Sequence, residues 1–244
     1  MKKKENGLIC ILKGFHGGQM TEKELYEEFV NLARQLFFDG HFEVAVEGKC
    51  NRKIYLQAIE FYYHEEDENG IKDPVMYHSN DHEKRELPYF EIGRFNMHQS
   101  GVDVTFENPQ KHYRASFLIR AYSFEPNPTE KKKCEVRSTH IYDDMFFMGV
   151  PMDKSIEITW ANDNEDSSNW KSNGMWRLNV ADYEKDEKGK YIKKNSKGER
   201  DDKKGSYHKI EEKAGENSFS YSGKIYRKCT RNWRFVKNKE LFDK

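Results

Sequence analysis

One stretch of the sequence decides the fold, and it reads IYLQAIEFYY at residues 54–63. Apolar or aromatic residues fall on both of its faces, a pattern typical of a strand that is buried on both sides. A single carboxylate, Glu60, interrupts the stretch, and in a second apolar run, at residues 115–122, the only charged residue is Arg120. The sequence therefore predicts two buried strands, each with one charged residue.

The segment before this stretch has the pattern of an amphipathic helix. Thr21 and Glu24 have the spacing of a capping box, in which each side chain satisfies a free backbone N–H at the start of a helix. Gly40 follows as the expected stop. The apolar positions that recur at helical spacing are Leu25, Phe29, Leu32, Ala33, Leu36 and Phe37.

Shorter segments with period-two alternation surround these elements. We expect strands at residues 42–46, 102–106, 156–160 and 176–180, a turn at 48–51 and a polar loop at 161–173. The fold class is then α+β, with a curved, mostly antiparallel sheet and peripheral helices. We expect one domain over residues 1–244, with its core at about 8–160 and 175–236. Residues 184–204 contain almost no apolar side chains and are predicted to form a mobile loop.

The composition indicates a soluble, non-secreted protein. Hydrophobic residues make up 36% of the chain and charged residues 34%. Its four cysteines are widely spaced, without the C-x-x-C pairs of zinc or redox motifs, which favours free thiols in a reducing compartment. The apolar run after the first lysines is too short for a signal peptide, and no stretch is long enough to span a bilayer. We expect a cytoplasmic protein, without membrane contact, and a monomer.

Charge gives only weak guidance about partners. The net charge is zero, whereas a duplex-binding protein needs clustered cations to replace the counterions of phosphates. From residue 184 onward, however, the chain contains 19 Lys and Arg residues but only 11 Asp and Glu residues. Such a basic segment is more often a solvated surface than a phosphate-binding patch, and both interpretations remain open.

Glu60 is the residue most suggestive of chemistry. A buried carboxylate is costly unless it is paired or hydrogen-bonded. It is either the partner of Arg120 in a structural ion pair, or a general base that activates water. The two roles are compatible if Arg120 orients the carboxylate.

The histidines offer fewer possibilities. His78 and His82 have the i, i+4 spacing of metal ligands on a helix, but prolines bracket the segment and no H-E-x-x-H pattern is present. His98 precedes a turn that leads to the strand of Asp103, where it either lines a pocket or stabilises the turn. No nucleophile elbow, P-loop or dinucleotide-binding fingerprint occurs. We therefore expect no metal and no cofactor.

The order of these predicted elements and short motifs along the chain is similar to that in a known family. The capped helix is followed by two strands, the second ending in Glu60-Phe61-Tyr62, and then by an acidic loop with His78. A Gly-led aromatic segment begins at Gly93, and Leu118-Ile119-Arg120-Ala121 stands shortly before Glu125-Pro126. Arg234-Phe235 lies near the C-terminus. In this arrangement the chain resembles the methylpurine (alkyladenine) DNA glycosylases.

The resemblance implies a function in base-excision DNA repair. Glu60 would activate the hydrolytic water, Tyr62 and His78 would contact the flipped base, and Arg120 would hold the site together. His98 and Asp103 join them as candidate substrate-binding residues. Family members extrude the damaged purine from double-stranded DNA and need neither metal nor cofactor. A basic rim for the duplex would come from Arg227, Lys228, Arg231 and Arg234.

The sequence departs from the family where base selectivity and DNA insertion reside. The family's Tyr-Gly-Met-Tyr segment reads Asn96-Met97-His98-Gln99-Ser100-Gly101 here, so neither the wedge residue nor the pocket Asn can be assigned. The interval from Glu60 to His78 is also stretched. The alternative is therefore a non-catalytic or small-ligand-binding protein of the same fold without DNA activity.

Overall fold

The computed structural model describes residues 7–80, 85–147, 154–172, 174–175, 177, 183–185, 191–193, 218–221, 224–227 and 231–242. The side chains of 49–51 and of all described residues from 183 to 227 are not included in this description. The chain divides into two compact units. The first comprises Met1–Gly174 with Phe235–Lys244, and the second is Met175–Arg234.

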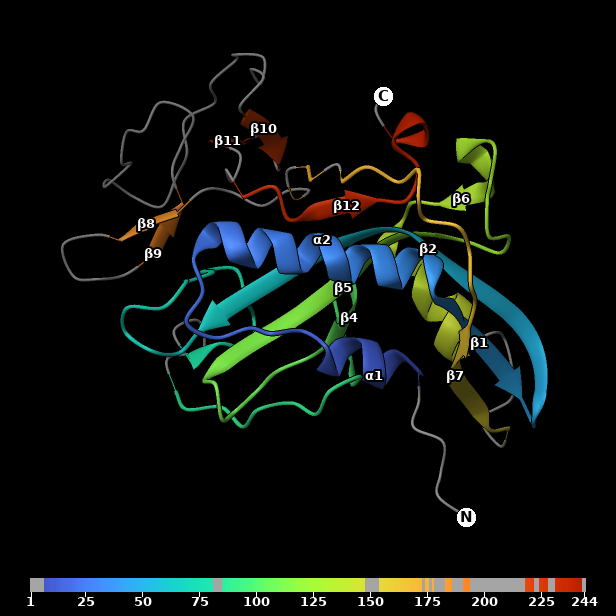
Figure 1. Ribbon diagram of the computed structural model, residues 1–244, viewed down its shortest axis with the longest axis horizontal. Coiled ribbons are helices and arrows are strands. Elements are labelled where there is room, and N and C mark those ends of the chain that lie inside the picture. The colour runs from blue at the N-terminus through green and yellow to red at the C-terminus, as the bar shows by residue number, and fades with distance from the viewer. Residues whose placement is uncertain are drawn as a thin grey trace. The chain divides into compact units, whose positions relative to one another are not determined.

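The first unit is built on a curled antiparallel sheet with a few helices (Figure 1). Its strands run in the order β3 (Phe95–His98), β4 (Gly101–Thr105), β5 (Tyr113–Ser123), β2 (Lys49–Glu65), β1 (Gly40–Val46) and β7 (Ile156–Asn162). β6 (Cys134–Glu135) pairs with β5, and β12 (Arg234–Val236) pairs with β2. The expected sheet is thus confirmed at the level of an antiparallel α+β fold.

The helix α2 (Glu22–Phe38) covers one face of this sheet. Its capping box is formed as expected, because Thr21 Oγ1 accepts from the Glu24 N–H and a Glu24 carboxylate oxygen accepts from the Thr21 N–H. All six apolar positions named for this helix are buried. Figure 1 shows α2 lying over β2, and the Phe29 ring stacks on Phe61 of β2 with the ring centroids 4.4 Å apart. This aromatic contact identifies the α2 side of the sheet as the core.

Gly40 has a different role from the expected helix stop. The helix is capped by Asp39, whose N–H donates to the Gln35 carbonyl, and Gly40 is already the first residue of β1. A Cβ at Gly40 would lie 2.4 Å from the Ala161 carbonyl oxygen and 2.4 Å from Trp160 Nε1 on β7. Gly40 is therefore required by the close approach of two strands.

The turn between β1 and β2 is also shorter than expected. It consists of Glu47 and Gly48, both with positive φ, and Val46 pairs directly with Lys49. Such two-residue turns match the twist of the strands that they join. The turn predicted at residues 48–51 was thus placed too late in the chain.

Residues 56–60 of β2 pair irregularly with β5. The register joins Leu56 to Tyr122, Ala58 to Ala121 and Ile59 to Ile119, so it passes over Gln57 on β2 and Arg120 on β5. Buried Gln57 donates to the Ser123 hydroxyl at 2.9 Å. Bulges of this kind bend strands and redirect side chains.

Short helices complete the first unit, namely α1 (Gly7–Lys13), η1 (Lys131–Lys133), η2 (Ser138–His140), η3 (Tyr142–Phe147) and η4 (Lys239–Leu241). The second unit contains the strand pairs β8 (Tyr183–Lys185) with β9 (Tyr191–Lys193), and β10 (Ser218–Tyr221) with β11 (Lys224–Arg227). The strand expected at 176–180 lies almost entirely outside the described residues, and so does the loop expected at 184–204, apart from parts of β8 and β9.

Two further features of the described chain bear on the expectations from composition. No helix in the described ranges is long and apolar enough to cross a membrane. Cys10 and Cys134 are free thiols, exposed and buried respectively, and burial raises the pKa of Cys134. The side chains of Cys50 and Cys229 lie outside the description.

Candidate functional site

The sheet face opposite α2 carries a row of polar side chains. Phe61 points into the core, and successive residues of a strand alternate between faces, so Glu60 and Tyr62 point the other way. Leu118 of β5 pairs with Glu60 on one side and with Asp103 on the other, which places both carboxylates on this second face. We call it the polar face and define it by Glu60, Tyr62, His64, Asp103, Thr105, Arg114, Ser116 and Arg120.

Glu60 is held by two neighbours at the centre of the polar face. Its side chain is 0% exposed, and its Oε2 lies 2.6 Å from Arg120 Nη2 and accepts from the Tyr62 hydroxyl at 3.1 Å. Burial alone would lower the pKa of the Arg120 guanidinium, but the Glu60 charge and hydrogen bonds to Glu60 and Tyr62 raise it above its ordinary value. The expected pair of Glu60 with Arg120 is confirmed, and it fixes the orientation of the carboxylate.

Asp103 and His98 form a second pair on the next strands. His98 Nδ1 accepts from the Ser100 N–H at 3.3 Å, so the ring proton belongs on Nε2, which lies 3.3 Å from Asp103 Oδ2. His98 thus stabilises the turn between β3 and β4, whereas its role in lining a pocket stays a prediction. The Tyr77 ring lies 5.1 Å from the His98 ring and is half exposed.

Ser116 is a site residue that the sequence analysis missed. It pairs with Tyr62 on one side and Thr105 on the other, and its side chain is fully buried. Residues 114, 116 and 120 are polar, but Leu118 and Tyr122 share their parity, so the run 113–123 has no strict period-two pattern. The pairing of Ser116 with Tyr62 and Thr105 is what places it in the group.

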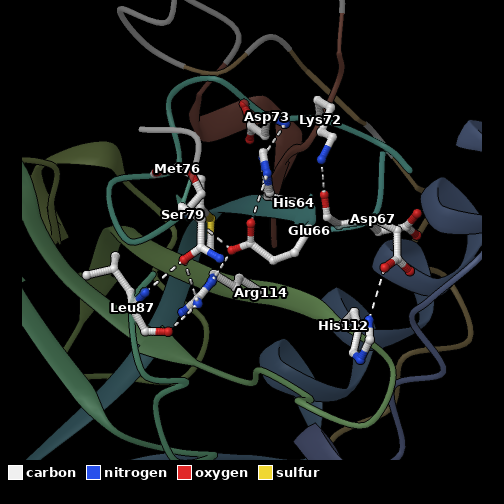
Figure 2. A network of polar contacts seen from close by, with 12 residues as sticks. His64, Glu66, Asp67, Lys72, Asp73, Met76, Ser79, Leu87, His112 and Arg114 are labelled. Carbon is white, nitrogen blue, oxygen red and sulfur yellow. Dashed lines mark hydrogen bonds and ion pairs between the residues drawn. The ribbon is translucent and has the colours of Figure 1, made fainter. Parts of the chain in front are cut away.

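A dense network around Arg114 occupies the end of the polar face next to the loop at residues 66–92 (Figure 2). Arg114 is fully buried, and its guanidinium donates to three carbonyl or amide oxygens at 2.7–3.2 Å, besides contacting two carboxylates. Nearby, His64 Nδ1 accepts from the Asp73 N–H at 3.2 Å. The acceptors of Arg114 are Glu66, Asn80, Leu87, Pro88 and Glu107.

His78 belongs to this network rather than to the Glu60 group. Its Nδ1 lies 2.5 Å from Glu107 Oε1, its ring lies 5.1 Å from the Phe90 ring, and it is 5% exposed. Glu107 in turn contacts Arg114 at 3.3 Å. His78 therefore anchors the loop that carries Tyr77, and its role as a base contact stays a prediction. His82 lies outside the described residues.

The predicted basic rim falls in the second unit. Arg231 lies over the Trp233 ring with its guanidinium carbon 4.6 Å from the centroid, and Arg234 Nη2 lies 3.4 Å from Met175 Sδ. The side chain of Arg227 and all of Lys228 lie outside the description. A rim beside Glu60 thus remains a prediction.

A hollow of about 530 Å³ lies at the end of β5, lined by Phe124, Glu125, Lys132, Lys133, Cys134 and Glu135. Its charges are paired locally, since Lys133 lies 2.9 Å from Glu125 and Lys132 lies 2.6 Å from Glu130. Because the charges in these pairs largely cancel, the electrostatic potential of the hollow is too weak to attract a charged ligand.

The described ranges contain no group of three or more His, Cys, Asp or Glu that could hold a metal ion. Comparison of the chain with models of protein families, with curated proteins and with solved structures gave no match. The polar face itself therefore carries the functional argument.

Proposed function

We propose that the chain is an N-glycoside hydrolase of the DNA glycosylase type, which excises damaged purines with Glu60 as the general base. The observation that carries this proposal is the arrangement of Glu60, a fully buried carboxylate oriented by Arg120 and Tyr62 on the face of the sheet that α2 leaves uncovered. The sequence resemblance likewise assigns the activation of water to Glu60 and the support of the site to Arg120, whereas it assigns to Tyr62 a contact with the flipped base.

The chemistry requires few groups. Water attacks the sugar carbon, the C–O bond forms as the glycosidic C–N bond breaks, and the bonding electrons leave with the base. Glu60 accepts the proton of the attacking water, a step that typically contributes a factor of about 10²–10⁴ to the rate. Arg120 and Tyr62 act as positioning residues that keep the carboxylate in one orientation.

The substrate would be a nucleotide turned out of double-stranded DNA. Extrusion costs a few kcal/mol, and the cost is lowest for damaged or mismatched bases. In this proposal Arg231 and Arg234, with Arg227 and Lys228, supply the contacts to phosphates. Binding should then weaken steeply as salt rises, because each neutralised phosphate releases counterions.

The test is excision of methylated purines and hypoxanthine from labelled duplexes by the wild type and by Glu60→Gln. The near-isosteric change keeps a hydrogen-bond acceptor for Arg120 and Tyr62 but removes the base. We expect excision to fall by about 10²–10⁴-fold.

The matched control is Glu165→Gln. Glu165 also pairs with a buried cation, Lys237, at 2.9 Å, but it belongs to a different part of the first unit. It should retain full excision. A wild type that excises no base would overturn the enzymatic proposal and leave a ligand-binding protein of this fold. Equal loss in both variants would indicate damage to folding, which a urea unfolding curve of each variant detects.

A further inference from the structure

The central polar face contains two buried polar atoms that are not satisfied within the described residues. Asp103 Oδ1 and Ser116 Oγ have no hydrogen-bond partner among them, although Asp103 is 4% exposed and Ser116 is fully buried. A buried polar group without a partner costs about 1–3 kcal/mol, and a charged one costs more. Such atoms are expected where a ligand completes the hydrogen bonding.

The two atoms belong to adjacent rows that also contain the Glu60 group. One row across three strands is Glu60, Leu118 and Asp103, and the next is Tyr62, Ser116 and Thr105. Neighbouring strands are about 4.8 Å apart, so Glu60 and Asp103 are separated by roughly 10 Å at the backbone. Leu118 lies between them on the same face, so a purine with its glycosidic bond at Glu60 would lie along Leu118 with its far edge toward Asp103.

Asp103 lies beside His98, a residue of the turn that leads to its strand. His98 Nε2 lies 3.3 Å from Asp103 Oδ2 but forms no hydrogen bond with it, and His98 Nδ1 accepts from the Ser100 N–H. The turn is held in place by the Tyr142 hydroxyl, which donates to the Gly101 carbonyl at 2.6 Å. Asp103 Oδ1 can offer a ligand only an acceptor, because an ionised carboxylate cannot donate a hydrogen bond.

We propose that Asp103 and Ser116 recognise the exocyclic amino group of a purine, so that the site selects amino-bearing bases over their deaminated, oxo-bearing counterparts. An amino group donates to Asp103 Oδ1, with Ser116 as a second polar contact. An oxo group at the same place brings its acceptor oxygen against the acceptor Oδ1 of Asp103, and the two repel each other. This inference rests on the proposed function for the placement of the base, and it narrows the substrates to amino purines.

The first test uses free bases, so that neither DNA binding nor hydrolysis is needed. Calorimetric titration of the wild type with adenine and with hypoxanthine should show adenine binding at least about tenfold more tightly, as expected for a hydrogen bond to a charged group. In Asp103→Asn the amide can turn its NH₂ group toward an oxo group. This variant should lose the preference or reverse it.

Two controls separate recognition from folding. Asp144→Asn changes a half-buried carboxylate that contacts Arg52 and Tyr122 outside this group, and it should keep the wild-type preference for adenine. Ser116→Ala keeps the Asp103 acceptor and should reduce adenine affinity while preserving the order of the two bases. Unfolding curves verify that each variant is folded.

The outcomes distinguish this inference from the proposed function. Equal or tighter binding of hypoxanthine, or no binding of either base, overturns the inference. If the protein prefers adenine but excises no base from any duplex, the recognition of amino groups is supported and the proposed hydrolase activity is contradicted. If it excises hypoxanthine in preference to methylated adenine, the hydrolase activity is supported and the recognition of amino groups is contradicted.

Discussion

Two arginines on β5 point to the same face of the same sheet and have different surroundings. Arg114 is fully buried and contacts five acceptors, three of them neutral oxygens of the loop at residues 66–92. Arg120 lies six positions further along and holds Glu60 at 2.6 Å. Close to the Arg120 group, Asp103 Oδ1 and Ser116 Oγ lack partners among the described residues.

The difference separates a structural cluster from a candidate site. At Arg114 the fixed donors of the guanidinium are matched by acceptors from the chain itself, as in a network that specifies one conformation. Around Arg120 the chain orients a carboxylate, and the nearby Asp103 Oδ1 and Ser116 Oγ have no hydrogen-bond partner among the described residues. His78 and Glu107 at the edge of the Arg114 network also have such atoms, so the contrast lies in the partners of the two arginines themselves.

The largest expected effect comes from removing the structural arginine. Arg114→Met leaves Glu107 and Glu66 without their buried cation, and the loss of one partner of a buried pair costs about 3–5 kcal/mol. Urea unfolding should show this loss. Arg120→Met removes the cation from one fully buried carboxylate, Glu60, rather than from two carboxylates, and should cost less. The reverse order would contradict the contrast between the two arginines.

A double-mutant cycle sharpens the contrast at the candidate site. Arg120→Met leaves the Glu60 charge buried, whereas Glu60→Gln with Arg120→Met removes both charges. The double variant should regain about 1 kcal/mol or more relative to Arg120→Met alone, as expected for directly coupled groups. Strict additivity of the single changes would show that the pair at 2.6 Å contributes no coupling.

Two buried serines of β5 provide a matched comparison at smaller magnitude. Ser123 accepts from Gln57 at 2.9 Å and donates to the Glu125 carbonyl at 2.6 Å, while Ser116 Oγ has no described partner. Ser123→Ala should destabilise the protein by about 1–2 kcal/mol. Ser116→Ala should be neutral or stabilise it by about 0.5 kcal/mol, at the expense of adenine affinity. Equal destabilisation would indicate that Ser116 has a partner in the free protein.

The smallest effect belongs to a pair at the surface. Hydrogen bonds from Arg137 lower the pKa of Glu135 to about 2 from its ordinary 4.5. This stabilisation is complete above about pH 4.5 and is lost as the pH falls toward 2. After allowance for solvent screening, Glu135→Gln should cost about 1 kcal/mol at pH 7, and the difference from the wild type should shrink between pH 4.5 and 3.

Unfolding midpoints at pH 7, 4.5 and 3 measure this dependence. Glu130→Gln is the control, because Glu130 is half exposed and pairs with exposed Lys132. It should change stability by less than about 0.5 kcal/mol. A cost of Glu135→Gln that grows as the pH falls would have the wrong sign for a lowered carboxylate pKa.

The sequence predicted those features whose pattern is local. The capping box of Thr21 with Glu24, the burial of residues 54–63 and the pairing of Glu60 with Arg120 all follow from periodicity and from the cost of an unpaired buried charge. The curled antiparallel sheet follows from alternating apolar segments. The role of the Glu60 group in catalysis stays a prediction.

The remaining features depend on contacts without a periodic signal. The loop at residues 66–92 has no regular spacing, so its attachment to Arg114 could not be foreseen. Gly40 was read as a helix stop because glycine commonly ends helices, whereas here β7 approaches too closely for a side chain. The carboxylate partner of His78, Glu107, lies far along the chain, so no local pattern indicated this pair, and the base contact that the resemblance implies for His78 stays a prediction.

The paired irregularity in β2 and β5 has a consequence for how this sheet tolerates changes of chain length. The register passes over one residue on each strand, Gln57 and Arg120, so the two offsets cancel and Glu60 still faces away from α2. Deleting Gln57 alone would shift the rest of β2 by one position and exchange its two sides. Phe61 would then leave the aromatic cluster and Glu60 would enter it. Relatives of this chain that lack a residue at one of these positions should therefore lack one at the other, a paired length change that direct sequence alignment can detect.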